Sequence, residues 1–478
     1  MSSNTALRSI VTLTFLILTV ACGAENGNHL AEGGIEGTGI TDDAPHVSIG
    51  SISGFGSIFV NGVEFETTSS TVIINGDVMS HVDGSDDPLK LAMVVTVEGE
   101  INDDGSTGTA DLIVFDRDVQ GPIATITTID FSHKQLLILG LEVLVSSDTV
   151  FEGVSFETLT ENEVVEVSGF VNADNQLVAT WLQKQADSFE EGEEIEVEAH
   201  ITTLDLAQQI LTLSALTVDY SQANLVRFSN ETPSVGDFIE VRGSSFNESG
   251  HLVAEKVKYK GEKLNIEEGS KLELEGVISS FTSVSEFSLH GVTVNAENAT
   301  IKKGNINDLA IGLRVEVEGL IDDNEVLLAS EVTIKKESQL RLTAPVSAID
   351  SETGVITLIT VDITIDNQTA FQDVGSNHLK YFNTNDIAVG DWLTIRATGI
   401  GEDIVASKVI RIQDRKQVTI KGPIDSLSLN SAVVLGVSLD MSAVSMEEQM
   451  QFAVGDSLSV TGESSEDVVF VAEVERDE

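Results

Sequence analysis

The 478-residue sequence predicts an all-β protein in which one small domain is repeated about six times. Beyond residue 46, apolar and polar residues alternate in short runs, which is the period of half-buried strands. One nine-residue segment also returns along the chain. It reads VGDFIEVRG at 235–243, VGDWLTIRA at 389–397 and VGDSLSVTG at 454–462. Alternation without long helical stretches, together with a recurring strand, indicates tandem β-repeats.

Two landmarks that stay in phase give the number of repeats. A strand ending in a small residue recurs with its ends 70, 74, 76, 78 and 65 residues apart, and an opening strand recurs with it near 50, 121, 199, 276, 344 and 422. Because both landmarks occur six times in the same order, we predict six repeats. They cover residues 47–117, 118–187, 192–260, 268–336, 337–413 and 414–478.

Each repeat has room for five short strands. The fourth and fifth are joined by polar turns such as NDDGS at 102–106 and NESG at 247–250, whose residues favour hairpin geometry. Five strands in about 70 residues fit a small closed barrel of the oligonucleotide/oligosaccharide-binding (OB) type. An immunoglobulin-like sandwich normally needs about 100 residues and seven strands. We expect the short helix of such a barrel in the variable middle, for example at 305–312, and to be brief or absent in several copies.

Residues 1–21 have the layout of a secretory signal peptide. Arg8 is the one charged side chain, and the apolar run from Val11 to Val20 is too short to span a membrane. The only cysteine, Cys22, follows this run directly and leaves no disulfide framework. The stretch TVAC resembles the bacterial lipobox, which implies lipidation of Cys22 with palmitate-type chains. The alternative is a plain export signal with an incidental cysteine.

The segment that follows predicts how the repeats are attached and where. Residues 22–46 are rich in glycine and acidic residues and lack apolar periodicity, which is typical of a flexible tether. The residue after the cysteine is Gly23 and not the aspartate associated with inner-membrane retention, so the resemblance implies the outer membrane. The periplasmic and the surface face both stay open.

A family resemblance agrees with this layout. The motif GGIEGTGI after the cysteine, then GSISGFGSIFVNGVEFET, then the repeated strand G-D-x-h-x-V-x-G (h apolar, x any residue) resemble bacterial lipoproteins with domain of unknown function 5666. The resemblance covers nearly the whole mature chain. It is best in the first repeat and weakest in the fifth, where Ala397 replaces the strand-end glycine. It implies a fold and an envelope location, and it implies no activity.

The net charge and the absence of known catalytic motifs argue against several classes of function. A formal net charge of -52, spread along the chain, repels polyanions, so we predict no nucleic-acid partner. The sequence contains no zincin, nucleophile-elbow or P-loop motif, so we predict no catalytic residues, no cofactor and no enzyme. Clustered carboxylates in two loops offer an alternative, a calcium site, although turn chemistry also explains them. The candidate ligands are Asp83, Asp86, Asp87, Asp103 and Asp104.

Three functions follow from these observations. The leading one is a non-catalytic array of β-barrels, anchored to the membrane at Cys22, that serves as an interaction or structural module with an envelope protein or glycan partner. The second is a binding module for an oligosaccharide, a peptide or calcium. The third is an enzyme with a site hidden in one repeat. Polar residues buried together in a single repeat would favour the third.

Overall fold

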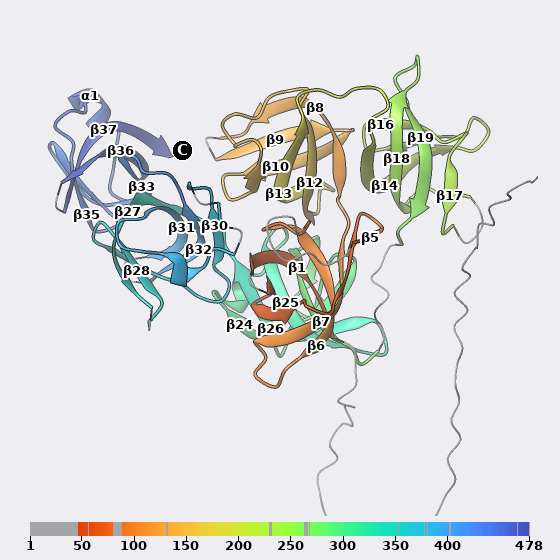
Figure 1. Ribbon diagram of the computed structural model, residues 1–478, viewed down its shortest axis with the longest axis horizontal. Helices are drawn as coiled ribbons and strands as arrows, with labels where there is room; N and C mark the ends of the chain where they lie inside the picture. The colour runs from red at the N-terminus through yellow and green to blue at the C-terminus, as the bar shows by residue number, and fades with distance from the viewer. Residues whose placement is uncertain are drawn as a thin grey trace, which may run out of the picture. The chain divides into compact units, whose positions relative to one another are not determined.

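The structure is a computed structural model that describes residues 46–477, apart from 56, 80–87, 131, 229–231, 262–265, 267, 352, 377, 380, 401, 402 and 466. The described part is almost entirely β-structure (Figure 1), which confirms the predicted fold class. Its helical elements are α1 (Met446–Gln449) and the 3-10 turns η1 (Ile306–Asp308) and η2 (Thr384–Asp386). None of these described helices is long and apolar enough to cross a bilayer.

Repeat 2 shows how one copy of the domain closes. β8 (Val119–Thr128) pairs with β9 (His133–Ile138), β9 with β10 (Leu141–Ser146), and β10 with β13 (Leu177–Ala186). β13 pairs with β12 (Val164–Val171), which returns to β8. The contact between β10 and β13 is parallel and all others are antiparallel. The predicted five-stranded OB-like barrel is therefore confirmed.

The same ring is found in the other five repeats, with a parallel contact between its third and fifth strands. Repeat 1 uses β1 (His46–Phe55), β2 (Ile58–Val60), β3 (Val63–Glu66), β6 (Val94–Ile101) and β7 (Thr107–Phe115). Repeat 3 uses β14 (Ile195–Asp205), β15 (Ile210–Leu213), β16 (Leu216–Asp219), β18 (Phe238–Phe246) and β19 (Leu252–Tyr259). Repeat 4 uses β20 (Lys271–Val277) continued by β21 (Ser280–Ser283), β22 (Glu286–Leu289), β23 (Val292–Asn295), β25 (Arg314–Ile321) and β26 (Val326–Lys335).

The last two rings follow in the same order. Repeat 5 uses β27 (Leu340–Asp350), β28 (Val355–Leu358), β29 (Val361–Thr364), β31 (Trp392–Ile400) and β32 (Asp403–Arg411). Repeat 6 uses β33 (Val418–Ser428), β34 (Ser431–Val434), β35 (Val437–Asp440), β36 (Ser457–Ser465) and β37 (Val468–Asp477).

The variable middle of a repeat holds a short extra strand that sequence reasoning did not find. In repeats 1 to 5 this strand runs parallel to the fifth strand of the ring, and in repeat 6 the helical turn α1 stands in the same part of the chain. The segment 305–312, where a short helix was predicted, contains η1. The extra strands are β4 (Thr71–Ile74), which also pairs with β5 (Asp77–Met79), β11 (Val150–Glu152), β17 (Asn224–Val226), β24 (Thr300–Lys302) and β30 (Ala370–Asp373).

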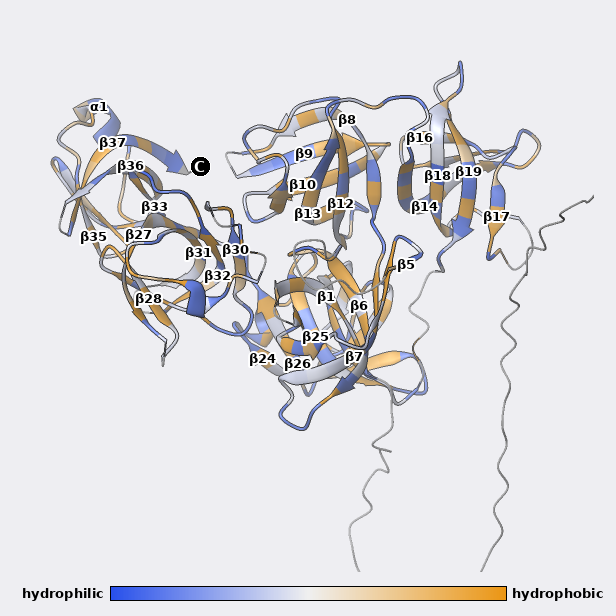
Figure 2. Ribbon diagram, viewed as in Figure 1, coloured by the Kyte–Doolittle hydropathy of each residue, from blue (hydrophilic) through white to orange (hydrophobic). Residues whose placement is uncertain are grey.

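Strand alternation places apolar side chains inside each ring and polar ones outside. In β18, Ile239 and Val241 are fully buried in the core of repeat 3, and they alternate with the charged Glu240 and Arg242. Figure 2 shows the resulting exchange of hydrophobic and hydrophilic residues along the strands. The outer faces therefore carry the chain's charged chemistry.

The small residue that ends the fourth strand marks a bulge in all six rings. The register between the fourth and fifth strands shifts there each time. A Cβ atom built on Gly243 would lie far inside van der Waals contact with the carbonyl oxygen of Val253. Close backbone approach therefore explains the recurring glycine of the strand motif. The six bulge positions are Gly99, Gly169, Gly243, Gly319, Ala397 and Gly462.

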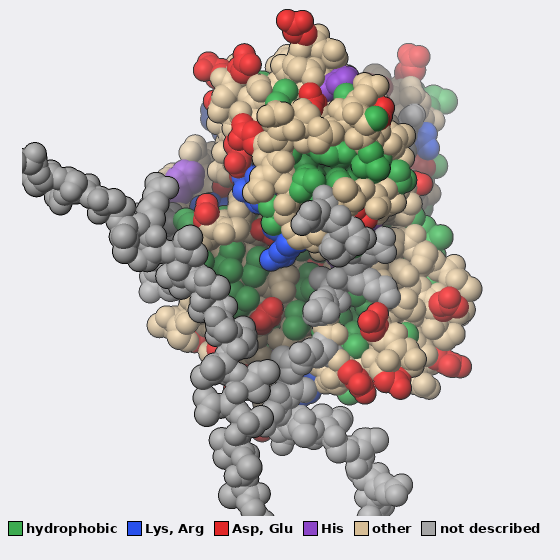
Figure 3. All heavy atoms as spheres, turned by 90° about the vertical axis from the view of Figure 1, so that its right-hand side faces the viewer, with side chains coloured by type: hydrophobic (Ala, Val, Ile, Leu, Met, Phe, Trp, Pro, Cys, Tyr) green, Lys and Arg blue, Asp and Glu red, His purple; other side chains and the backbone are tan. Residues whose placement is uncertain are grey.

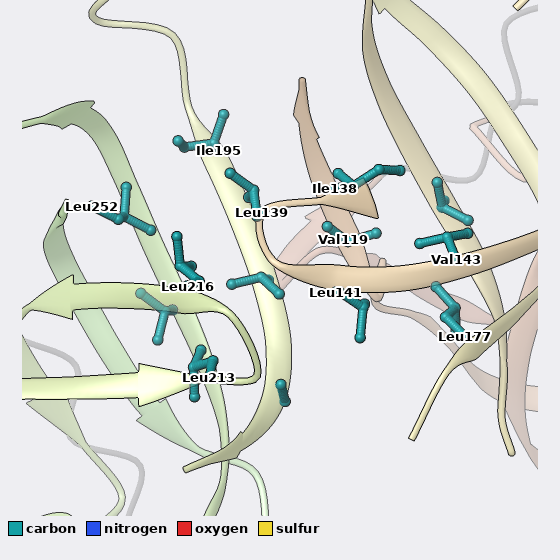
Figure 4. Packing of buried hydrophobic residues seen from close by; sticks show 14 of the residues in the cluster. Val119, Ile138, Leu139, Leu141, Val143, Leu177, Ile195, Leu213, Leu216 and Leu252 are labelled. Atoms are coloured by element: carbon teal, nitrogen blue, oxygen red, sulfur yellow. The ribbon is translucent and has the colours of Figure 1, made fainter. Parts of the chain in front are cut away.

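The repeats join in pairs through their opening strands. β8 of repeat 2 pairs antiparallel with β14 of repeat 3, and β27 of repeat 5 pairs antiparallel with β33 of repeat 6. β1 of repeat 1 pairs in parallel with β20 of repeat 4, over His46–Ile49. One apolar core runs through repeats 2 and 3, and Leu139 and Leu216 are among its members (Figure 4).

Candidate functional site

Charged side chains gather on the outer face of repeat 3, where it joins repeat 2. Glu240 accepts hydrogen bonds from Lys256 Nζ at Oε1 and from Lys258 Nζ at Oε2, both at 2.9 Å. The Nε atom of Arg242 lies 2.8 Å from Glu240 Oε1. We name this group the Glu240 cluster; its members are Arg117, Glu196, Glu240, Arg242, Lys256 and Lys258.

Strand register assembles this cluster. Glu240 lies opposite Lys258, and Arg242 lies opposite both Glu196 and Lys256 on its two neighbouring strands. Opposite charges that face one another across a sheet are favourable, so the alternating EVR and KVK segments bring their own partners together. Arg117, which precedes β8, joins the cluster through Nε at 2.7 Å from Glu196 Oε2.

The cluster holds Glu240 in its ionised form. Its side chain is 1% exposed, and burial alone would raise the pKa of its carboxyl group. Hydrogen bonds from Lys256 and Lys258, helped by the charge of Arg242, outweigh burial and lower the pKa of Glu240 to about 2. The surrounding cations therefore stabilise the ionised carboxylate, and the carboxylate in turn neutralises their charge.

Geometry alone would also allow a metal ion here. Oxygen atoms of Glu196, Glu198 and Glu240 all lie within 4.8 Å of one another. However, Glu198 lies 2.7 Å from Lys260 Nζ, and the other two carboxylates bind the cations of the cluster. Because lysine and arginine groups bind these oxygens, the arrangement is that of an ion-pair network within repeat 3, which Arg117 joins from the segment before β8.

The outer face of repeat 4 is more acidic. Glu273 lies opposite Glu318, and Glu275 lies opposite Glu316, so like charges face one another across β20 and β25. Such pairs are destabilising unless a cation intervenes. Glu275 binds Arg314 Nη2 at 2.8 Å, and Glu316 binds Lys335 Nζ at 2.6 Å. Among the described residues, neither Glu273 nor Glu318 forms an ion pair with a lysine or arginine.

A cavity lies beside these carboxylates. Its volume is about 420 Å³, and Glu273, Glu316, Glu318 and Glu331 line part of its wall. Loss of hydration, followed by the negative charges of Glu273 and Glu331, raises the pKa of Glu318. Lys302 and Lys303 also line the cavity, and the charges of His46 and Lys302 act on Glu318 in the opposite direction, so its negative surroundings are partly offset.

The matching face of repeats 5 and 6 is basic. Lys408, Arg396, Arg341 and Lys421 stand in one row across β32, β31, β27 and β33. Lys408 is 7% exposed. Burial, and then the charge of Arg396, lower its pKa to about 7, while Asp148 acts in the opposite direction. Three outer faces of one fold thus carry three different charge patterns.

A comparison with protein families identifies the repeat. The model of a domain of unknown function, DUF5666, matches residues 48–113, 120–183, 193–258, 275–333 and 343–410. This chain belongs to the DUF5666 family. The five matches fall on repeats 1 to 5, and repeat 6 has the same ring of strands although no match covers it.

The other comparisons add little to the DUF5666 assignment. No curated protein matches the chain. A solved structure described as "drosophila Unr CSD456" is 15% identical, covers 46% of this chain and 97% of its own, and has a TM-score of 0.12. Likeness at that score carries no argument about the fold or function of the DUF5666 array.

The residues predicted as calcium ligands fall into two groups. Asp83, Asp86 and Asp87 lie outside the described residues. In the turn between β6 and β7, Asp104 Oδ1 accepts the backbone N–H groups of Ser106 and Thr107 at 2.8 and 2.9 Å. These bonds lower the pKa of Asp104. Asp104 thus stabilises its own hairpin, as turn chemistry predicts, and the calcium site stays a prediction.

The charged faces were not found from the sequence. Each of their residues sits in an alternating strand, where a solvated surface is the ordinary expectation. The signal that could have found them is position within the repeat. Three opening strands, β14, β20 and β27, each pair with the opening strand of another repeat. Each carries a charged residue at the equivalent position: Glu196, Glu273 and Arg341. The lipidation residue predicted from the sequence, Cys22, lies outside the described residues.

Proposed function

We propose that this chain is a non-catalytic lipoprotein of the cell envelope, in which tandem DUF5666 barrels form an interaction or structural module. One observation carries the proposal: Arg117, in the short segment between the barrels of repeats 1 and 2, binds a buried carboxylate of repeat 3. Its Nε atom lies 2.7 Å from Glu196 Oε2 of β14. Side chains used in this way support an array built to hold its barrels together.

The proposed cellular location rests on residues 1–21, which have the layout of a signal peptide. An apolar run that ends at Ala21, directly before the only cysteine, supports export followed by lipidation of Cys22. Dual acylation gives stable membrane attachment, whereas a single chain binds only marginally. We propose the outer membrane as the site of the anchor, on the basis of Gly23.

The surface supports partners other than nucleic acids. Figure 3 shows carboxylate side chains spread over the visible face, with few lysine and arginine side chains among them. With a formal net charge of -52, the chain repels phosphate backbones and attracts cationic groups. We propose an envelope protein or a glycan as the partner, in addition to the membrane reached through Cys22.

The anchor is tested by replacing Cys22 with alanine. We expect loss of fatty-acid labelling and a chain that no longer remains with the membrane after washing in salt, because the acylated thiol is gone. Gly23→Ala is the matched control and should keep both properties. A Cys22→Ala chain that is still labelled and still bound to the membrane would contradict the proposal. Protease treatment of intact cells then separates a surface location from a periplasmic one.

A further inference from the structure

Two cations of repeat 5 lie next to each other on its outer face without an acceptor between them. Lys408 on β32 lies opposite Arg396 on β31. Lys408 is 7% exposed, and it forms no hydrogen bond or ion pair among the described residues. The Nε atom of Arg396 is buried and has no hydrogen-bond partner there either. Because buried polar groups are nearly always bonded, this pair of donors calls for an explanation.

The acceptors that do contact Arg396 bind another part of its guanidinium group. Its Nη1 atom donates to Ser147 Oγ at 2.7 Å and lies 3.3 Å from Asp148 Oδ1. The other carboxylate oxygen of Asp148 accepts the backbone N–H of Ser338 at 2.9 Å. The edge formed by Nε and Nη2 therefore has no acceptor among the described residues. Such an edge binds the two oxygens of a carboxylate or phosphate group.

Repeat 3 shows what the same pair of cations binds when an acceptor is present. Arg242 and Lys256 lie opposite one another as Arg396 and Lys408 do. One carboxylate oxygen bridges them, because Glu240 Oε1 lies 2.8 Å from Arg242 Nε and 2.9 Å from Lys256 Nζ. The pairing of an arginine with a lysine across these two strands thus forms a place for one carboxylate.

Repeat 5 has no carboxylate at the equivalent position. Thr394, two residues before Arg396 on β31, stands where Glu240 stands in repeat 3. Its hydroxyl group shares a hydrogen bond of 2.9 Å with Thr343 and carries no charge. A water molecule would accept hydrogen bonds from both cations, but it would leave two like charges buried together. An anion would satisfy the donors and also remove the cost of the unpaired charges.

The electrostatic surroundings favour a negative charge at this place. The row of cations continues with Arg341 on β27 and Lys421 on β33. Loss of hydration and the charge of Arg341 lower the pKa of Arg396, whereas Asp148 and Glu157 act in the opposite direction. These two acids face a row of four basic residues, so positive charge is in excess. The side chain of Arg396 is 14% exposed, which leaves a small ion a way in from solvent.

We propose that Arg396 and Lys408 bind one small oxyanion, a carboxylate or a phosphate group, in the place that the Glu240 carboxylate takes in repeat 3. One oxygen accepts hydrogen bonds from Arg396 Nε and Lys408 Nζ, and a second oxygen accepts from Nη2. The bound ion turns the unbalanced face of repeat 5 into a network like that of repeat 3. The anchor at Cys22 does not depend on this site.

Hydrogen exchange of β31 and β32 in the full chain measures binding at repeat 5 itself. Inorganic phosphate is one probe and acetate is the other. Sodium chloride keeps the ionic strength at about 0.15 M, so that screening stays equal. We expect protection that saturates with at least one probe, with exchange about tenfold slower at about ten times the dissociation constant. The probe that binds more tightly identifies the oxyanion as a phosphate or a carboxylate.

Two substitutions should abolish the response to the probes. Lys408→Met removes one of the two donors. Thr394→Glu supplies the missing carboxylate from the chain itself, so β31 and β32 should exchange more slowly without a probe and gain nothing when one is added. Lys421→Met is the matched control, because it removes a cation at the other end of the row. It should respond like the parent.

Circular dichroism shows whether each variant is folded, and if Lys408→Met does not fold, Thr394→Glu decides. Three results would overturn the proposal. The first is that neither probe gives saturable protection. The second is a response that survives in a folded Lys408→Met or Thr394→Glu chain. The third is a response that Lys421→Met loses to the same extent, since this would indicate diffuse attraction to the whole row.

Discussion

Repeats 3 and 5 place the same two cations on the same two strands and surround them differently. Arg242 and Lys256 lie opposite one another on β18 and β19, as Arg396 and Lys408 do on β31 and β32. In repeat 3, carboxylates flank the two cations. Glu196 faces Arg242 from the opening strand, and Glu240 lies next to it on β18.

In repeat 5 those carboxylates are absent from the equivalent positions. Arg341 stands where Glu196 stands, and Thr394 stands where Glu240 stands. Asp148 of repeat 2 forms an ion pair with Arg396, at 3.3 Å from its Nη1 atom. The barrel therefore does not determine the charge on its outer face. The residues at the outward-facing strand positions determine it. Substitutions there can replace a network of opposite charges by a row of like charges while the strands stay the same.

The largest effect is expected from Glu240→Gln. It removes the charge that forms ion pairs with Arg242, Lys256, Lys258 and Lys260, and breaking a buried ion pair from one side costs about 3–5 kcal/mol. The stability of repeat 3 is measured locally, by hydrogen exchange of β18 and β19, because a chain of six repeats does not unfold in one step.

The dependence on pH supplies the control for Glu240→Gln. With a folded pKa of about 2, the stabilisation by Glu240 is complete above its ordinary value of 4.5 and is lost as pH falls through about 2. Parent and variant should therefore differ most near neutral pH and converge in acid. Equal exchange rates of β18 at neutral pH would show that the cluster contributes no stability.

Lys408→Met is expected to stabilise the protein, in contrast to Glu240→Gln. Among the described residues of repeat 5, Lys408 has no carboxylate partner, and replacing buried charged groups by apolar side chains of similar volume often stabilises a protein by about 1–4 kcal/mol. The folded pKa of about 7 lies below the ordinary 10.5, so the folded state pays the full cost of burying the ammonium group below pH 7. The gain in melting temperature should be largest there and should shrink as pH rises toward 10.5.

The matched substitution in repeat 3 is Lys256→Met. It removes a hydrogen bond to Glu240 Oε1, so it should destabilise β18 and β19 at neutral pH. If Lys408→Met stabilises and Lys256→Met destabilises, the surrounding carboxylates determine what a lysine at this position contributes to stability. If both substitutions change stability in the same direction, that conclusion is wrong.

The smallest effect concerns the bulge. Gly243→Ala puts a Cβ atom against the carbonyl oxygen of Val253 and should cost about 1–3 kcal/mol, as overpacking does. The equivalent residue of repeat 5 is Ala397, which the ring already contains at the same register shift. Ala397→Gly should therefore cost no more than about 1 kcal/mol, through chain entropy. Hydrogen exchange of the fifth strand in each repeat measures both changes, and a silent Gly243→Ala would show that the glycine is not required.

The sequence predicted the ring better than the joints between rings. Alternation and the recurring small residue are local signals, and they led to the closed five-stranded barrel and its hairpin turns. The extra strands, such as Asn224–Val226, have three or four residues, which is too short to show a period of two. The pairing of β1 with β20 links positions far apart in the chain, and no local pattern encodes it.

The contact between His46 and Glu273 was missed for the same reason. His46 stood at the end of the predicted tether and Glu273 in a strand of another repeat, so no spacing in the sequence connects them. Burial makes His46 noticeable, and burial there depends on contact with a second repeat. Conversely, the acidic turn at Asp103 and Asp104 drew attention as a calcium candidate because its residues are adjacent, although Asp104 is bound to its own backbone.

The pairing of β1 with β20 also sets an order for folding as the chain is made. Ser48 and Glu273 are 225 residues apart, whereas β8 and β14 meet across a much shorter loop. Closing the longer loop costs only about 1 kcal/mol more in entropy, but the partner strand does not exist until repeat 4 has been synthesised. Until then the edge of β1 is open to pairing with other chains. We expect repeat 1 to be synthesised first, and yet the edge of β1 to become protected from pairing with other chains only after repeats 2 and 3 have folded.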